Sequence, residues 1–380
     1  MGTKLIFGAA VIFVLFCLLG LRENEQKKQT FHVNYSVLDS IDLSDYKKDV
    51  KRGDFELFFD NNTFLIIDRE ENSLNIFDIS TRKIVAKKAI QLDSFSSIYG
   101  VHFCTQDSIY LLIHNDKLNV EDLYLIDKNA VEKRKIDLTP LLPKDTCEYN
   151  LFAHHVTNIE VIGNYLCVLR GECGNKINIE YFNQKHNQNL IQLYEIDDSN
   201  ERFYNAIGKY PNHYQYHFYY NEHVRLCTNH AEKKILISFP NSDSIVLYKL
   251  PTLQAETYYF GTQAYKMPAS DFPIKKFNDY QYIKKYIVEN SFYDKVFFQN
   301  NKYYRVVDFG IDYVNEDSTI NLAIEKPWQL LISDSTFTNI KSVVFEKSKY
   351  KSYTIMPIGD KWLIQRADDA NIFDVIKINQ

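Results

Sequence analysis

Six pairs of hydrophobic runs recur along the chain, and in each pair a polar turn separates the two runs. The second runs of the six pairs are 74–79, 123–127, 190–197, 244–250, 328–334 and 372–378. A two-stranded unit cannot cover its own apolar faces, so each unit has to pack against the next one. Repeats of this kind are typical of radially repeated sheet proteins. The pattern therefore predicts an all-β chain that folds as a closed six-bladed β-propeller, with seven blades as the alternative.

The composition supplies enough apolar mass for one large sheet domain. The 380 residues include 28 Tyr and 26 Phe against 12 Gly, a balance that favours strands. The 49 acidic and 44 basic residues give a net charge of −5 and are mixed along the chain. Because a nucleic-acid surface needs a concentrated positive patch, we expect no nucleic-acid partner.

The amino terminus carries a signal for export or anchoring. Lys4 precedes an uncharged segment, 5–21, and charged residues return at Arg22. This segment is short for a spanning helix and slightly long for the apolar part of a secretory signal, so three outcomes stay open: a retained membrane anchor, lipidation at Cys17, and simple cleavage. Cys17 follows the bulky Phe16, where a bacterial lipoprotein signal has a small residue. All three outcomes bring the folded domain to the cell envelope, outside the cytoplasm.

These features divide the chain into three parts. Residues 1–22 are the signal or anchor segment, 23–57 are a linker, and 58–380 are the propeller domain. The linker contains one alternating apolar stretch, formed by Val37, Leu38, Ile41 and Leu43. Alternation of this kind predicts a strand, which we expect to be donated to a distant blade to close the ring.

Two segments interrupt the repeats. The first, 171–189, is polar and rich in Asn, and it predicts a loop on one rim that either takes part in binding or is a surface excursion. The second lies between the fourth and fifth units, where Asn278 or Asp279 can cap a short crossover helix. The apolar stripe of that helix consists of Tyr282, Ile283, Tyr286 and Ile287. We expect the helix to pack on the edge of the ring.

Several short segments carry a resemblance to a known family. They are SFYD at 291–294, NKYYR at 301–305, LLISD at 330–334, GKYP at 208–211 and FPNS at 239–242. In these segments the chain resembles an uncharacterised group of Gram-negative envelope proteins. Members of that group are lipoprotein-like, are taken to be six-bladed propellers, and carry the label of a domain of unknown function. The resemblance extends over most of the chain beyond the amino terminus and implies an architecture and a location. It implies no catalytic residues, and the chain departs from the group at the lipidation signal.

Polar residues open several of the predicted first strands. The candidate ligand-binding residues are His102, His155, His223, Arg225, Asp294 and Arg305. If the first strand of each blade lines the central channel, these side chains converge on one mouth. A few converging polar groups in an apolar scaffold are the usual geometry of a ligand site, and Arg adds forked recognition of carboxylate or phosphate groups. The alternative is a hydrated channel without a ligand.

The sequence contains no motif of an established catalytic chemistry. A GxSxG elbow, an HExxH helix, a D-x-D-x-D loop and a Gly-rich phosphate loop are all missing. The six cysteines include no CxxC pair. We therefore expect no metal, no cofactor and no disulfide framework.

Together these features predict an envelope-tethered binding or interaction module, with recognition at the channel mouth and at the rim formed by 171–189. The expected partner is a protein of unknown identity or a small molecule such as a saccharide, besides the membrane reached through the amino-terminal segment. Two alternatives stay open. One is an enzyme that acts on a saccharide or another acidic small molecule, with the channel His and Arg residues as acid, base and anion clamp. The other is a structural component of an envelope assembly.

Overall fold

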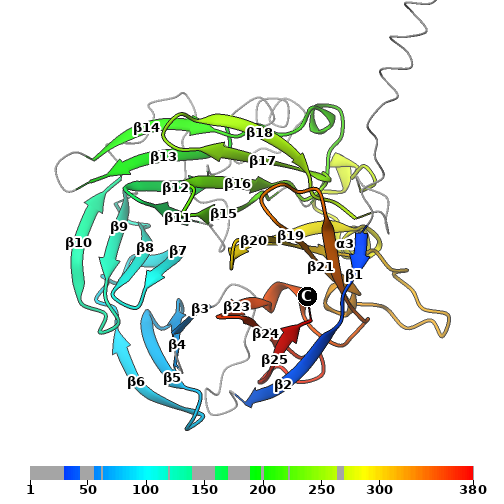
Figure 1. The fold of residues 1–380 in the computed structure, drawn as a ribbon, viewed down its shortest axis with the longest axis horizontal. Coiled ribbons are helices and arrows are strands. Elements are labelled where there is room, and N and C mark those ends of the chain that lie inside the picture. The colour runs from blue at the N-terminus through cyan, green and yellow to red at the C-terminus, as the bar shows by residue number, and fades with distance from the viewer. Residues whose placement is uncertain are drawn as a thin grey trace, which may run out of the picture.

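The computed structural model describes residues 30–42, 55–60, 63–118, 120–138, 159–169, 189–197, 201–220, 223–262 and 269–379. These residues form six sheets that are arranged in a ring (Figure 1). The six-bladed propeller predicted from the repeats is confirmed.

Each blade is an up-and-down meander. Blade 1 contains β3 (Phe55–Asp60), β4 (Thr63–Asp68), β5 (Ser73–Asp78) and β6 (Lys83–Ala89). Blade 2 contains β7 (Ser96–Thr105), β8 (Ser108–Asn115), β9 (Val120–Ile126) and β10 (Glu132–Asp137). Blade 3 contains β11 (Ile159–Ile162), β12 (Tyr165–Leu169), β13 (Ile191–Ile196) and β14 (Glu201–Ile207). Blade 4 contains β15 (Arg225–Asn229), β16 (Lys234–Ser238), β17 (Ser244–Lys249) and β18 (Gln254–Tyr259).

The last two blades also take strands from the amino-terminal part of the chain. Blade 5 contains β19 (Phe292–Gln299), β20 (Lys302–Asp308), β21 (Trp328–Ser333) and β22 (Ile340–Phe345), with β1 (Thr30–His32) added at its outer edge. Blade 6 contains β23 (Met356–Ile358), β24 (Lys361–Gln365), β25 (Ile372–Ile378) and, as its outer strand, β2 (Tyr35–Asp42).

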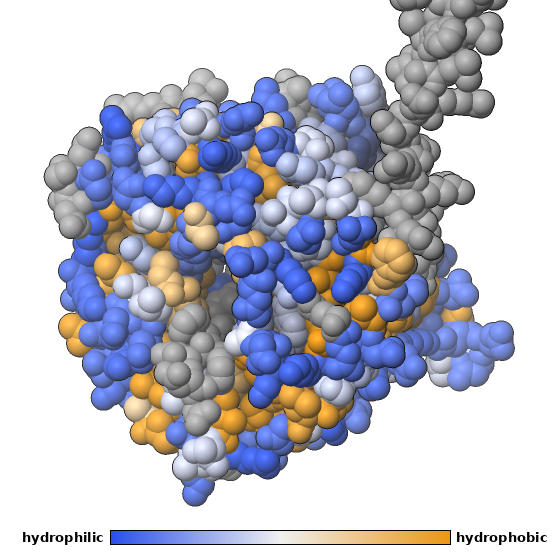
Figure 2. Space-filling model, in the orientation of Figure 1, coloured by the Kyte–Doolittle hydropathy of each residue, from blue (hydrophilic) through white to orange (hydrophobic). Residues whose placement is uncertain are grey.

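The first strand of every blade lies nearest the centre of the ring (Figure 1). First strands of neighbouring blades touch, as β7 does with β11, β11 with β15 and β15 with β19. Hydrophilic residues make up much of the face shown in Figure 2, and the face is hollowed near its centre. Side chains on the first strands are therefore positioned to meet at a shared channel.

The hydrophobic runs that define the repeat occupy one structural position. All six second runs coincide with the third strand of a blade, from β5 in blade 1 to β25 in blade 6. These strands have neighbours on both edges and blades on both faces, so apolar residues are favoured at successive positions. All six residues of β21 are buried.

Six hydrophobic clusters fill the spaces between the blades. Leu65 and Leu111 pack together between blades 1 and 2, and the clusters that follow lie between each later pair. The sixth cluster joins Phe64 and Phe77 of blade 1 to Leu363 and Phe373 of blade 6. Because this last interface is packed like the other five, the ring is closed.

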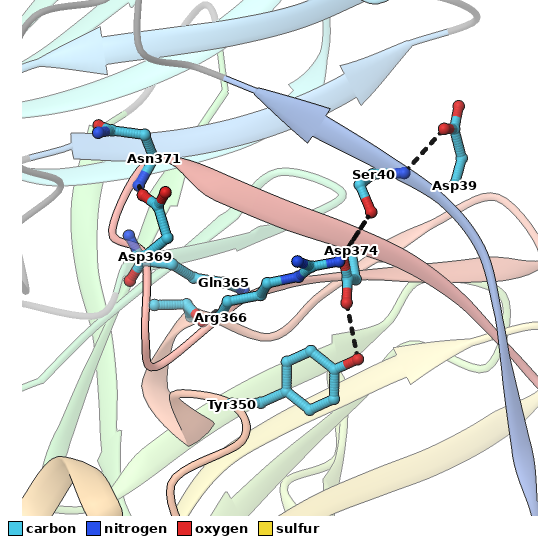
Figure 3. Close-up of polar contacts among 9 residues, drawn as sticks. Asp39, Ser40, Tyr350, Gln365, Arg366, Asp369, Asn371 and Asp374 are labelled. Atoms are coloured by element: carbon cyan, nitrogen blue, oxygen red, sulfur yellow. Dashed lines mark hydrogen bonds and ion pairs between the residues drawn. The ribbon is translucent and has the colours of Figure 1, made fainter.

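The linker supplies the hydrogen bonds that close the ring. β2 pairs antiparallel with β25, and β1 runs parallel to β22. Beside this seam the buried Asp374 accepts hydrogen bonds from Ser40 Oγ at 2.7 Å and from the Tyr350 hydroxyl at 2.7 Å (Figure 3). Arg366 Nε adds a third at 2.9 Å. The carboxylate thereby joins the donated strand to the carboxyl-terminal hairpin.

One α-helix, α3 (Tyr280–Glu289), is present in the part of the chain that the structure describes. Asp279 caps it, because its Oδ1 accepts from the Tyr282 backbone N–H at 3.1 Å. Ile283 and Tyr286 of the helix join the cluster between blades 3 and 4, as expected for a helix on the ring edge. Among the described residues no helix is both long enough and apolar enough to cross a membrane. Residues 1–22, including Cys17, lie outside the described residues.

Candidate functional site

The channel wall carries a polar cluster built by three successive blades, which we call the channel cluster. It consists of His102 on β7, Glu160 on β11, Thr228 on β15, and His230 directly after β15. Thr228 Oγ1 donates to Glu160 Oε2 at 2.8 Å, and His102 Nδ1 lies 3.5 Å from the same oxygen. The rings of His102 and His230 are stacked with their centroids 6.4 Å apart. One carboxyl group thus meets two imidazoles and a hydroxyl.

Burial favours the uncharged forms of this cluster. The His102 and Glu160 side chains are only 12% and 17% exposed. Desolvation, followed by the proximity of His230, lowers the pKa of His102 to about 4. Desolvation raises the pKa of Glu160 to about 7, although the hydrogen bond from Thr228 opposes the rise. Near neutral pH His102 is therefore neutral, and Glu160 is poised between its two forms.

One polar atom of the cluster has no partner. His102 Nε2 is buried and lacks a hydrogen bond of normal geometry to any described residue, although the Ile159 backbone beside the ring acts to raise the pKa of His102. A buried polar atom of this kind is costly unless something pairs with it. His230, in contrast, is exposed, and it gives the cluster a solvent-facing side.

Three thiols lie close enough to the Glu160 carboxyl group for its charge to affect them. Burial, and secondarily the proximity of Glu160, raises the pKa of Cys104 to about 11 and also raises the pKa of Cys167 and Cys227. All three cysteines are free. Since only the thiolate is a strong nucleophile or metal ligand, these thiols act as small apolar side chains. Among the residues that the structure describes, no group of three His, Cys, Asp or Glu side chains is placed to hold a metal ion.

A second polar pair lies on the other face of β15. Arg225 donates to Asp294 Oδ1 of β19 from Nε at 2.9 Å and from Nη2 at 2.7 Å. Side chains three residues apart on a strand point to opposite faces, so Thr228 contacts blade 3 while Arg225 contacts blade 5. Arg225 and Asp294 are two of the residues expected to converge at the channel mouth, and in the structure these two side chains are in contact. Their side chains are 13% and 7% exposed.

The other predicted site residues lie apart from the channel cluster or outside the described residues. Arg305 lies on β20, the second strand of blade 5, and is fully buried against blade 4. His223 is exposed and precedes β15. His155 and residues 170–188, which include most of the predicted rim loop, lie outside the described residues.

Glu160 is not among the site residues predicted from the sequence. The sequence does contain a feature that could have indicated this residue, because Glu160 is the one charged residue in the otherwise apolar strand Ile159–Ile162. A charge in a short apolar strand is buried against neighbours, and buried charges are either paired or functional.

The fold and the channel cluster define a six-bladed propeller with a hydrogen-bonding site on its channel wall. No protein-family model matches the chain, and no curated protein matches its sequence. Among solved structures, the chain is similar to a member of the DUF4221 family from Bacteroides vulgatus, with 14% identity and a TM-score of 0.64 over 93% of this chain and 100% of that one. It is also similar to a protein from Bacteroides fragilis that is described as exported, with 11% identity and a TM-score of 0.50 over 91% and 96% of the two chains. At these identities the likeness concerns the fold.

Proposed function

We propose that this protein is a binding module and that the channel cluster holds an uncharged, hydroxyl-rich small molecule such as a saccharide. The observation that carries the proposal is the unpartnered His102 Nε2 beside the Glu160 carboxyl group on the channel wall. Burial disfavours charge on both groups, so a neutral ligand with hydroxyl groups suits them better than an ion. A hydroxyl both donates and accepts, and it can satisfy an imidazole nitrogen and a carboxyl oxygen together.

The test is thermal unfolding and calorimetry of the full chain with a panel of neutral mono- and disaccharides. We expect at least one sugar to raise the melting temperature of the wild type, and Glu160→Gln and His102→Phe to remove the effect. Glu256→Gln, on the outer strand β18, is the matched control and keeps it. Protection that is unchanged in Glu160→Gln places the site elsewhere, and a panel without any effect contradicts the saccharide assignment.

A second candidate function is acid–base catalysis at the same cluster. It is favoured by the pKa of Glu160, which burial raises to about 7, because a general acid or base works best when it titrates near the working pH. Most glycoside hydrolases use two carboxyl groups, however, and the described part of the channel cluster contains one. Turnover of panel glycosides with a midpoint near pH 7 that Glu160→Gln abolishes would favour the enzyme over the binding module.

We also propose that the domain works at the cell envelope and belongs to the DUF4221 group. The uncharged segment 5–21 and the structural likeness to a protein described as exported support this placement. Fractionation of cells that make the full chain tests it. We expect the protein in the envelope fraction, released to the soluble fraction when residues 1–22 are removed and a cleavable secretory signal is supplied. Full-length protein in the cytosol contradicts the proposal.

A further inference from the structure

Blade 5 carries a long insertion between its second and third strands. The connection from β20 to β21 spans residues 309–327, and it projects outward from the ring in Figure 1. Four other blades make the same connection with only a few residues, namely 69–72 in blade 1, 116–119 in blade 2, 239–243 in blade 4 and 366–371 in blade 6. In a repeat protein, an insertion of this kind lies on the surface and is often the part that binds.

Residues 312–322 of this connection form a small hairpin, which we call the blade 5 hairpin. Val314 and Ile320 lie opposite each other in an antiparallel bridge. One backbone hydrogen bond on each side flanks the bridge, at 2.8 Å and 2.9 Å. Val314 and Ile320 are therefore a pair without hydrogen bonds between them, and the side chains of such a pair lie close together on one face of the hairpin.

The polar side chains on the other face of the hairpin are hydrogen-bonded to the blade. Asn321 is 3% exposed, and its Nδ2 donates to the Asp312 carbonyl at 2.6 Å. Its Oδ1 accepts from Asn315 Nδ2 at 3.0 Å and from Lys347 Nζ at 2.6 Å. Lys347 follows β22, the last strand of the blade meander. Because these bonds tie the hairpin to the blade, its shape is fixed before any partner binds.

The apolar side chains of the hairpin face solvent. Val314, Ile320 and Leu322 are 53%, 56% and 52% exposed. Leu322 lies two residues after Ile320 and has an extended backbone, so it shares the face of Ile320. Polar groups thus point inward and apolar groups outward, the reverse of the usual arrangement. Such a pattern is unfavourable in water unless the apolar face is covered when the protein functions.

The charge and the shape of the hairpin indicate what covers this face. Asp312, Glu316 and Asp317 are exposed around it. These acids repel anionic lipid headgroups and nucleic acid. A small molecule binds in a concave site, whereas the hairpin is a projection. A protein with an apolar pocket and basic residues at the rim of that pocket complements both the apolar face and the acids.

We propose that the blade 5 hairpin docks a protein partner that offers an apolar pocket with a basic rim. Val314, Ile320 and Leu322 enter the pocket, and Glu316 at the tip of the hairpin meets the basic rim. This interaction is independent of ligand binding at the channel cluster, which belongs to blades 2, 3 and 4.

The first test is photo-cross-linking in intact cells that naturally make the protein. A benzophenone amino acid is placed in the full chain at position 320. Position 85 is the matched control, because Val85 on the outer strand β6 of blade 1 is 57% exposed. We expect an adduct with one protein from position 320 and none from position 85. An adduct with lipid, an adduct with a second copy of this chain, or no adduct beyond that of the control overturns the proposal.

The second test titrates the cross-linked protein, once identified and purified, against the full chain. We expect Ile320→Ser to keep the wild-type melting temperature and to weaken binding at least about tenfold. Glu316→Gln should weaken binding about three- to tenfold at low salt, and less at high salt. Val85→Ser and Glu160→Gln bind like the wild type, which separates the hairpin from the channel cluster. Wild-type affinity in Ile320→Ser or in Glu316→Gln overturns the proposal.

Discussion

The guanidinium group of Arg305 in blade 5 is hydrogen-bonded to blade 4. Arg305 Nε donates to Ser238 Oγ at 2.9 Å, and its Nη atoms donate to backbone carbonyls of the turn and strand ends around Phe239, Ser242 and Phe260 at 2.7 to 2.9 Å. Its Cζ lies 3.4 Å from the centre of the Tyr293 ring. A buried charge is tolerated only when it is fully hydrogen-bonded, and here backbone oxygens supply most of the partners.

Replacement of Arg305 should therefore unfold the protein far more easily than replacement of a surface arginine. We expect Arg305→Ala to lower the free energy of unfolding by about 3–5 kcal/mol, because it leaves several buried carbonyls unpaired. Arg202→Ala, which removes an exposed pair with Glu195 on β14 and β13, should cost much less. Urea unfolding of both variants measures the difference. Similar losses would show that Arg305 does not hold the interface.

His102 and Glu160 should have opposite effects on the pH dependence of stability. The folded-state pKa of Glu160 is raised from 4.5 to about 7, so its contribution is present below pH 4.5 and is lost as pH rises through 7. The folded-state pKa of His102 is lowered from 6.5 to about 4, so its contribution is present above pH 6.5 and is lost as pH falls through 4. Between pH 4.5 and 6.5 the two effects offset each other, because the pair binds one proton in either state.

Single substitutions should break this balance. Relative to the wild type, Glu160→Gln should lose roughly 2–3 kcal/mol of unfolding free energy as pH falls from 6.5 toward 4, since only the His102 effect is left. His102→Gln should lose a similar amount as pH rises from 4.5 to 7. Urea titrations at several pH values give the slopes, with Glu256→Gln expected to run parallel to the wild type. Parallel slopes for all variants would mean that the two pKa values are ordinary.

The sequence predicts some of these residues better than others. Arg225 and Asp294 both lie on first strands of adjacent blades, so strand order alone brings them close. Arg305 follows in the chain soon after Asp294, but it belongs to a second strand, and its partners come from blade 4. The position of a strand within its blade decides which side chains reach the channel. The identity of a polar residue does not reveal that position.

Among the elements, β2 is the strand that links the amino-terminal part of the chain to the last blade. It completes blade 6 from the far end of the chain, and Ser40 on β2 shares Asp374 with Tyr350 and Arg366 (Figure 3). Alternating apolar residues indicate that this stretch is a strand, and the unpaired edge of β25 explains where it binds. A β-sheet edge without a partner is prone to aggregate, so the donated strand also protects the ring.

Loss of the Asp374 carboxylate should loosen this closure. We expect Asp374→Ala to lower the free energy of unfolding by about 2–4 kcal/mol, because Asp374 is buried and accepts three side-chain hydrogen bonds. Asp369→Asn, which alters an exposed turn in the same hairpin, is the control and should change it by less than about 1 kcal/mol. Limited proteolysis gives a second readout, with cleavage at 30–42 accelerated in Asp374→Ala. Unchanged stability and unchanged cleavage would mean that β2 holds without this carboxylate.

At the scale of the whole molecule, the fold could be predicted and the site only in part. The six apolar third strands have similar lengths and indicate six repeated units. Each of these strands can bury its two faces only against neighbouring blades, so the hydrophobic pattern predicts a ring. The channel cluster does not follow, because it depends on how three first strands align beside one another. Residues 101–104 lie on β7 and residues 225–227 lie on β15, the first strands of blades 2 and 4. Glu160 lies on the first strand between them.

Glu160 is buried only because blades 2, 3 and 4 meet around it, so its protonation reports on the whole arrangement. The most direct test is the infrared carboxyl absorption of wild-type protein minus Glu160→Gln, followed as a function of pH. We expect a protonated carboxyl signal that disappears with a midpoint near pH 7 and shifts to higher pH in Thr228→Val, where the opposing hydrogen bond is gone. A midpoint in the ordinary range of a solvated glutamate, unchanged by Thr228→Val, would contradict the burial of Glu160 at the channel and the site built on it.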